Sequence, residues 1–302
     1  MKKIHYAFFG VAAIALIGAS FLLREGLPLE TVGSNIQKLV GGIFFVNSIT
    51  EADIKNTYAR AEIGPDRVKI LIVPGHDDDA WGTEFRGIRE ADLNAEVGEE
   101  LYALLKEDPH FASLLTRTRG GYAAEFLSYF ARELENIKKF RGENYGIMDN
   151  AVRSGLVGVR EDGVGHNFAP EETSLRLYGI NKWANENNID IVLHLHFNDY
   201  GGRVWNRPGE YSGFTIYIPE RQYSNAQASF AIAMNIFEQL SKYFPVSNLP
   251  KESVGTVEDQ ELIAIGANNS LDPAALLIEY GYIYESQFTN PNLRPHHMRE
   301  LA

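Results

Sequence analysis

Apolar runs alternate with segments of helical periodicity along most of this chain. Residues 70–73 are Ile, Leu, Ile and Val, and the Pro74-Gly75 pair ends this run abruptly. A run of this kind, rich in β-branched residues, predicts a strand that is buried on both faces. By the same reasoning we expect further strands at residues 114–118, 189–196, 213–218 and 274–279.

Apolar positions recur at three- and four-residue steps between these strands. Leu93, Val97, Leu101 and Leu104 follow this spacing, which predicts a helix over residues 90–106. Other helices are expected at residues 123–140, 174–187 and 226–243, and a helix with a capping box of Thr50 and Asp53 is expected at residues 51–61. This alternation predicts an α/β fold, a single three-layer domain of the phosphorylase/hydrolase type whose mixed, mostly parallel central sheet is flanked by helices.

The N-terminal segment has the order of an export signal. Lys2 and Lys3 precede an uncharged apolar run over residues 7–23, which Arg24 ends. A run of this length serves either as a cleaved signal peptide or as a membrane anchor. Both send the following chain out of the cytoplasm, either anchored in the membrane or secreted to the periplasm or cell wall. We therefore expect an apolar helix in residues 1–25, a stalk with a lead-in helix in residues 26–66, and the main domain in residues 67–302.

Composition narrows the classes of function. The chain has 302 residues, a formal net charge of -12 and no cysteine. The negative charge argues against nucleic acid as a partner, because that surface would need clustered Lys and Arg. Without cysteine, any metal must be held by His, Asp and Glu, the ligands of zinc sites of the catalytic type.

Ionisable residues lie at the C-terminal ends of three expected strands. They are His76, His196 and Glu279. Because the ends of parallel strands meet at one edge of a sheet, we expect these side chains to converge there. Glu90, at the start of a helix, is a fourth candidate, although the helix dipole alone would also explain a carboxylate there. Two imidazoles and a carboxylate leave zinc one open position, which suits a hydrolytic site, and a second carboxylate there could take up a proton.

Short blocks around these residues resemble a known family. In order along the chain they are Pro74-Gly75-His76, Glu90 with Asn94, His196-Phe197-Asn198 and Glu279-Tyr280-Gly281-Tyr282. They are similar to the signature blocks of the zinc-dependent N-acetylmuramoyl-L-alanine amidases (type 3) of the bacterial cell wall. The resemblance covers about residues 68–284.

The resemblance implies a site and a substrate. It implies that His76, Glu90 and His196 bind Zn2+ and that Glu279 is the general base. It also implies that the substrate is peptidoglycan, cut at the amide between N-acetylmuramic acid and L-alanine during cell-wall remodelling. An exported chain agrees with this substrate, which lies outside the cytoplasmic membrane. The sequence does not identify an activator protein.

Other residues near the blocks are candidates for contact with the ligands or the substrate. Asn94, Arg117 and Asn198 lie in or beside the family's blocks. His194 shares a strand face with His196, so it is either a partner of the site or a hydrogen-bonded core histidine. Asp79 is the alternative to Glu90 as the carboxylate ligand, because zinc carboxypeptidases place a carboxylate three residues after the first histidine.

Two departures from the family's pattern carry their own expectations. Asp77, Asp78 and Asp79 stand where the family has glycines, and we expect a solvated acidic loop. Residues 119–170 form an insertion. Its second half, from residue 141, is rich in Gly and Asn, which predicts a loop. The insertion is either surface padding, which we favour, or a lid that carries Glu161, Asp162 or His166 to the metal.

Two rival functions stay open at this point. The first is a carboxypeptidase-like zinc hydrolase acting on peptide stems or acylated amino acids, which needs an arginine clamp from Arg86, Arg89 or Arg203. The second is a non-catalytic wall-binding module of amidase descent. A stoichiometric metal in the purified protein would exclude the non-catalytic module. The bond that is cut would distinguish the carboxypeptidase-like hydrolase from the amidase.

Overall fold

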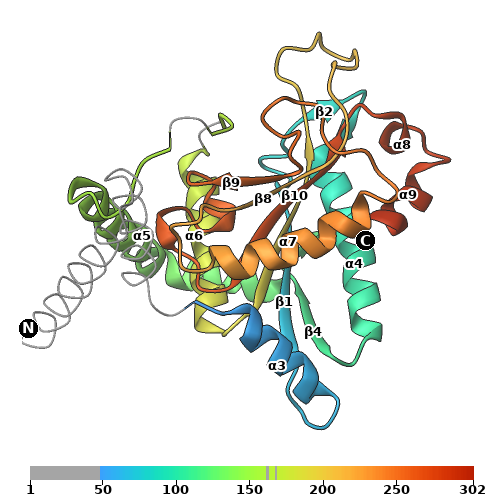
Figure 1. Cartoon of the computed structure of the whole chain (residues 1–302). Coiled ribbons are helices and arrows are strands. Elements are labelled where there is room, and N and C mark those ends of the chain that lie inside the picture. The colour runs from blue at the N-terminus through green and yellow to red at the C-terminus, as the bar shows by residue number, and fades with distance from the viewer. Residues whose placement is uncertain (1–47, 161–162, 167–168) are drawn as a thin grey trace, which may run out of the picture.

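The computed structural model describes residues 48–160, 163–166 and 169–302 (Figure 1). The apolar run at residues 7–23, most of the expected stalk, and Glu161 and Asp162 lie outside these ranges. Within the described ranges, no helix combines the length and the apolar character needed to cross a bilayer.

A six-stranded sheet forms the centre of the molecule, in the order β4-β1-β7-β10-β8-β9. β8 runs antiparallel to β10, and the other neighbouring pairs are parallel. The expectation of a mixed, mostly parallel sheet is therefore confirmed. The strands are β1 (Val68–Pro74), β4 (Phe111–Leu115), β7 (Ile191–Asn198), β8 (Thr215–Pro219), β9 (Thr256–Asp259) and β10 (Ala274–Tyr282).

Helices cover both faces of this sheet, which makes the fold a three-layer one (Figure 1). One face packs against α4 (Glu90–Glu107), α7 (Ala226–Leu240) and α9 (Arg294–Leu301). The other packs against α5 (Ala124–Arg153), α6 (Glu171–Glu186) and the short turn η1 (Ile263–Ile265). A second short turn, η2 (Ala267–Asn269), contacts α5 and η1. The smaller elements are α3 (Glu51–Ala61), α8 (Ser286–Thr289) and the hairpins β2–β3 (Glu84–Phe85, Ile88–Arg89) and β5–β6 (Arg117–Thr118, Gly121–Tyr122).

Alternation along each strand sends neighbouring residues to opposite faces. In β1, Ile70 and Ile72 pack on the α4 side, whereas Leu71 and Val73 pack on the α6 side. His194 and His196 of β7 share the α6 side with Val192, so the candidate site lies at the edge of this face.

The loop expected from residue 141 is wrong in its first half, because α5 continues to Arg153. Met148 and Ala151 are buried near the end of this helix and pack with Val157 and Tyr223. A Cβ atom at Gly142 or Gly146 would meet nothing within 4 Å, so the absence of a side chain at these two positions costs the helix no packing contact. Burial of the apolar side chains therefore outweighs the low helix propensity of two exposed glycines. The capping box of Thr50 and Asp53 at the start of α3 is confirmed.

Candidate functional site

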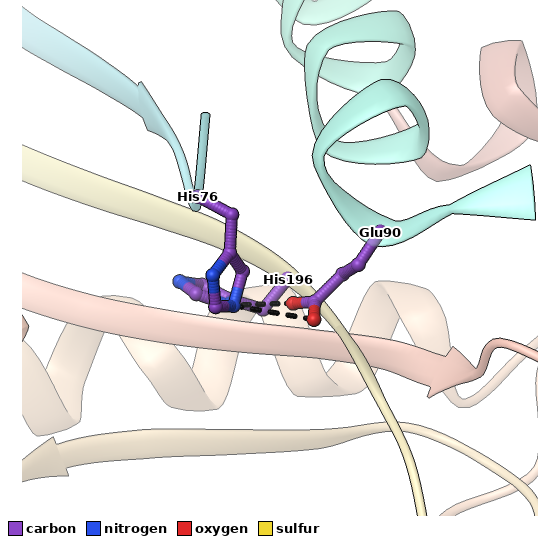
Figure 2. Close-up of side chains that lie close together, drawn as sticks. All are labelled: His76, Glu90 and His196. Atoms are coloured by element: carbon purple, nitrogen blue, oxygen red, sulfur yellow. Dashed lines mark hydrogen bonds and ion pairs between the residues drawn. The ribbon is translucent and has the colours of Figure 1, made fainter. Parts of the chain in front are cut away.

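His76, Glu90 and His196 lie together where neighbouring elements meet (Figure 2). His76 lies two residues after the end of β1, His196 lies near the end of the adjacent strand β7, and Glu90 is the first residue of α4. One possible ligand atom from each residue lies within 4.8 Å of the other two. They are the one such group of metal-ligating side chains in the described part of the chain, and Asp79 is not among them.

Glu90 joins the two imidazoles. Its Oε1 lies 2.9 Å from Nδ1 of His196, and its Oε2 lies 3.2 Å from Nε2 of His76. Burial alone would raise the pKa of Glu90, but the charge of His76 and the hydrogen bonds from both rings lower it well below its usual value. Burial lowers the pKa of His196, whereas the Glu90 carboxylate outweighs burial at His76 and raises its pKa. The site thus holds an ionised carboxylate between two imidazoles.

Two glycines leave the space that these side chains occupy. A Cβ atom at residue 75 would lie 2.7 Å from Cδ2 of His196, and one at residue 82 would lie 2.7 Å from Cδ2 of His76. Gly82 also has a φ of +75°, a conformation that glycine adopts without strain. His76 itself has a φ of 60°, which is uncommon for a residue with a side chain and is typical of functional sites.

Arg117 and Asn94 fix the backbone that carries His76. Arg117 donates to the carbonyl oxygens of Pro74, Gly75 and Ala91 at 3.0, 2.7 and 2.8 Å. Asn94 Nδ2 donates to the same Gly75 oxygen at 2.9 Å. The sequence names both residues as candidates for contact with the ligands or the substrate. In the structure, both side chains donate hydrogen bonds to the backbone carbonyl of Gly75, next to His76.

The three aspartates after His76 do not form a uniformly solvated loop. Asp77 Oδ1 accepts from the backbone N–H groups of Asp79 and Ala80 at 3.0 and 2.9 Å, and its Oδ2 pairs with Arg176 of α6. The Asp77 side chain is only 13% exposed, so the expectation of a solvated loop is wrong for this residue. Asp79 is 79% exposed and lies 3.2 Å from Arg176. Its carboxylate is therefore directed to an arginine rather than to His76 and His196.

Glu279 lies in β10, directly opposite His196 in the pairing of the two strands. Its Oε2 is buried without a hydrogen-bond partner among the described residues. Burial, followed by the charges of Glu90 and Glu252, raises the pKa of Glu279 well above its usual value. A carboxyl group with this environment is suited to holding a proton.

Glu252 is a buried carboxylate that the sequence analysis missed. Its oxygens accept from Ser247 Oγ, Tyr217 OH and Asn198 Nδ2 at 2.6, 2.7 and 3.0 Å, and from Tyr282 OH at 3.2 Å. Asn198, a candidate from the sequence, therefore ties the end of β7 to Glu252. No spacing signal marks Glu252, because its partners come from three different strands and a loop.

His194 is buried on the sheet face that carries His196, but it is not a hydrogen-bonded core histidine. It is 1% exposed, and neither ring nitrogen has a hydrogen-bond partner in the described part of the chain. Burial, together with the charge of His196, lowers the pKa of His194 to about 3. The imidazole is therefore neutral at physiological pH.

The insertion contributes helix α5 and, with His166, an imidazole that lines a cavity at the site. His166 Nε2 lies 2.8 Å from Oδ2 of Asp259, a residue that the sequence analysis did not single out. His166, His194, His76 and His196 line the same cavity. His166 is thus paired with Asp259 and is not part of the His76, Glu90 and His196 group.

Comparison with known proteins finds similarity in fold. No family model matches the sequence, and no curated protein matches it. The CwlD amidase from Clostridioides difficile, solved in complex with the GerS lipoprotein, superposes with a TM-score of 0.50 at 14% identity, over 78% of this chain and 92% of that one. An N-acetylmuramoyl-L-alanine amidase from Clostridium difficile 630 gives a TM-score of 0.47 at 15% identity, over 78% and 92%. AmiC2 of Nostoc punctiforme gives 0.46 at 15% identity, over 79% and 92%. This chain has the fold of N-acetylmuramoyl-L-alanine amidases.

Proposed function

We propose that this chain is a zinc-dependent amidase that hydrolyses the bond between N-acetylmuramic acid and L-alanine in peptidoglycan. The observation that carries the proposal is the convergence of His76, Glu90 and His196, with Glu279 on the adjacent strand opposite His196. The likeness in fold to the CwlD amidase supports the same conclusion.

The donor set fits a catalytic zinc ion. His76, Glu90 and His196 would hold the metal, because two imidazole nitrogens and a carboxylate are its preferred ligands and leave a position for substrate. When bound, zinc supplies a Lewis acid that polarises the amide carbonyl and acidifies water. The low pKa of Glu90 keeps its carboxylate ionised for this role.

Glu279 would act as the general base and then as the acid. Its unpartnered Oε2 is available to accept a proton from the attacking water, and its raised pKa favours holding that proton. The same carboxyl group would then deliver the proton to the nitrogen of the leaving amine. Both steps need only one side chain on the strand next to His196.

Peptidoglycan lies outside the cytoplasm, so this function requires an exported chain. The uncharged run over residues 7–23, preceded by Lys2 and Lys3, supplies the expected signal peptide or membrane anchor. We therefore propose an extracytoplasmic location, either at the membrane or in the periplasm or cell wall.

The carboxypeptidase-like alternative needs an arginine to bind a free carboxylate. Arg203 is occupied by Asp199 and the carbonyl of Glu84, whereas Arg86 and Arg89 stack over Phe85 and Trp81. The arginine that does line the cavity, Arg176, pairs with Asp77, Asp79 and Glu172. An uncharged amide substrate therefore suits this cavity better than a C-terminal carboxylate.

Digestion of purified peptidoglycan tests the proposal. We expect zinc-loaded protein to release stem peptides with a free L-alanine amino terminus, and chelated protein to release none. Glu279→Gln should lower turnover by at least about a hundredfold, because it removes the proton acceptor. Its zinc content, measured by elemental analysis, should equal that of the wild type.

The outcomes separate the rival functions. Free amino acids released from the C-terminal end of the stem would support the carboxypeptidase-like reading instead. Purified protein that binds no stoichiometric zinc would support the non-catalytic module. Near-normal cleavage by Glu279→Gln would refute the role given to Glu279.

A further inference from the structure

A cavity of about 900 Å³ lies between α6 and the sheet face that carries His194 and His196. His76 and His196 line it, so it is continuous with the candidate metal site. Much of its remaining wall is aliphatic and includes Val73, Leu177, Ile180 and Leu277. Its volume lies in the range of small-molecule sites, roughly 300–1,000 Å³, which combine apolar walls with a few polar groups.

His166 is an oriented polar group in this wall. Its Nε2 is held 2.8 Å from Oδ2 of Asp259, whose side chain is only 4% exposed. The other carboxylate oxygen of Asp259 accepts from the backbone N–H groups of Glu261 and Leu262 at 2.7 and 2.8 Å. Because Nε2 donates to this fixed carboxylate, Nδ1 is left to pair with a ligand, as an acceptor in the neutral ring or as a donor in the protonated ring. No partner for Nδ1 is found within the described ranges.

His194 is the second polar group. In the strand pairing it lies between Val73 and Leu277, both apolar, and neither of its ring nitrogens has a partner among the described residues. A buried polar group without a partner carries a free-energy cost in the folded chain. A ligand that forms a hydrogen bond with this ring removes that cost. The free energy of ligand binding is more favourable by the same amount.

The charges around the cavity select the kind of ligand. Arg176 is the one Arg or Lys that lines it within the described ranges, and it is already paired with aspartates and a glutamate. His166 is likewise paired with Asp259. An anionic group would find no unpaired Arg or Lys here, whereas an amide offers both a donor and an acceptor without a net charge.

We propose that this cavity is a specificity pocket for an uncharged amide group of the substrate next to the scissile bond, with His166 and His194 as its hydrogen-bonding side chains. The amide bonds of a peptide stem or an acetamido group both have this chemistry. The inference rests on the proposed function for the identity of the substrate. The contacts themselves can be tested without turnover.

The test measures binding of N-acetyl-L-alanine methylamide, a neutral diamide, to the zinc-loaded full chain carrying ¹⁵N-labelled histidine. The diamide should shift the ring nitrogen resonances of His166 and His194. His166→Phe and His194→Phe, which keep a planar ring, should each weaken its affinity by about tenfold or more, because they leave an amide group unpaired. The affinity of propionate, a carboxylate that carries no amide, should not depend on either histidine.

His110→Phe is the matched control. His110 is 21% exposed and lies 2.6 Å from Asp108, as His166 is 22% exposed and lies 2.8 Å from Asp259, but His110 does not line the cavity. It should leave affinity for the diamide unchanged. A second readout is the thermal stability of ligand-free His194→Phe, which should equal or exceed that of the wild type because an unpaired polar ring is removed.

The results separate this inference from the proposed function. No binding of the diamide, or equal affinity in the wild type and both variants, overturns the pocket even if peptidoglycan is cut. Histidine-dependent binding in a protein that cuts no peptidoglycan upholds the pocket and overturns the proposed amidase function. A loss of affinity in His110→Phe equal to that in His166→Phe would also overturn the pocket.

Discussion

Gly82 brings the loop after His76 against the side chains of the candidate metal site. A Cβ atom there would meet the Glu90 carboxylate and the His76 ring, whereas a Cβ atom at Gly87 would meet nothing within 4 Å. Both glycines have a positive φ, +75° and +81°, so alanine is similarly strained at either position. Comparing alanine at the two positions therefore separates the effect of backbone strain from the effect of crowding Glu90 and His76.

We expect Gly82→Ala to weaken zinc binding by about 10- to 100-fold, a loss typical of displaced ligand support. The Glu90 carboxylate is buried and hydrogen-bonded to both imidazoles, so its displacement also costs stability. Gly82→Ala should therefore lose more stability than Gly87→Ala, whose loss from backbone strain is roughly 1 kcal/mol. Zinc titration and urea unfolding measure the two effects, and equal zinc affinity in the two variants would contradict this account of Gly82.

Residues at strand ends were predictable, and their partners were not. His76, His196 and Glu279 follow apolar runs, and the structure places all three at one edge of adjacent strands. Glu252, Asp259 and Arg176 carry no comparable signal, because each acts through residues that are distant in sequence. The positive φ of His76 also cannot be read from its neighbours.

At the scale of elements, Asp77 connects the loop after β1 to helix α6 through Arg176. Burial would raise the pKa of Asp77, but hydrogen bonds from the backbone and the charge of Arg176 outweigh it and lower the pKa below 3.8. A carboxylate with a lower pKa in the folded chain than in the unfolded chain stabilises the fold when ionised. This contribution is complete above about pH 4 to 5 and is lost as pH falls through the folded-state value.

Asp77→Asn should therefore reduce the free energy of unfolding by roughly 1 kcal/mol at pH 7, a modest value because the site is partly solvated. The difference from the wild type should shrink as the pH falls to 3, since protonation of Asp77 in the unfolded chain then favours unfolding. Urea unfolding at several pH values measures it. Asp79→Asn is the control, because the Asp79 side chain is 79% exposed and should contribute little at any pH. A difference that stayed constant from pH 7 to pH 3 would mean that the ionised form of Asp77 is not what stabilises the fold.

The periodicity of the sequence located elements where burial is regular. Four of the five expected strands correspond to β1, β7, β8 and β10. The fifth, at residues 114–118, is wrong in its bounds, because it covers only the end of β4 and continues into β5, which pairs with β6 outside the central sheet. The periodicity missed β9, whose four residues Thr256–Asp259 include two acids, because pairing with β8 rather than an apolar run defines this strand. The periodicity also predicted an end for α5 that is too early. The burial of Met148 and Ala151, which extends this helix, depends on residues outside it.

At the scale of the whole molecule, the site joins both helical layers to the sheet. Glu90 begins α4 on one side, whereas the Asp77 loop beside His76 is tied to α6 on the other. A metal held by His76, Glu90 and His196 would link β1, β7 and α4 in the folded chain alone. Binding to the folded state alone raises the free energy of unfolding in proportion to the logarithm of metal concentration.

We therefore expect zinc at about a thousand times its dissociation constant to stabilise the full chain by about 4 kcal/mol, which corresponds to a rise of roughly 6 °C in the unfolding temperature. Glu90→Gln should lose most of this increment, because a neutral amide replaces the carboxylate ligand. Asp79→Asn should keep it, since Asp79 is directed to Arg176.

The increment should also shrink as the pH falls, because protons compete with zinc for the two imidazoles. Calorimetry with zinc, with magnesium and with chelator measures these effects. The reverse result, an increment lost in Asp79→Asn and kept in Glu90→Gln, would make Asp79 the carboxylate ligand and require the loop after His76 to turn towards the metal.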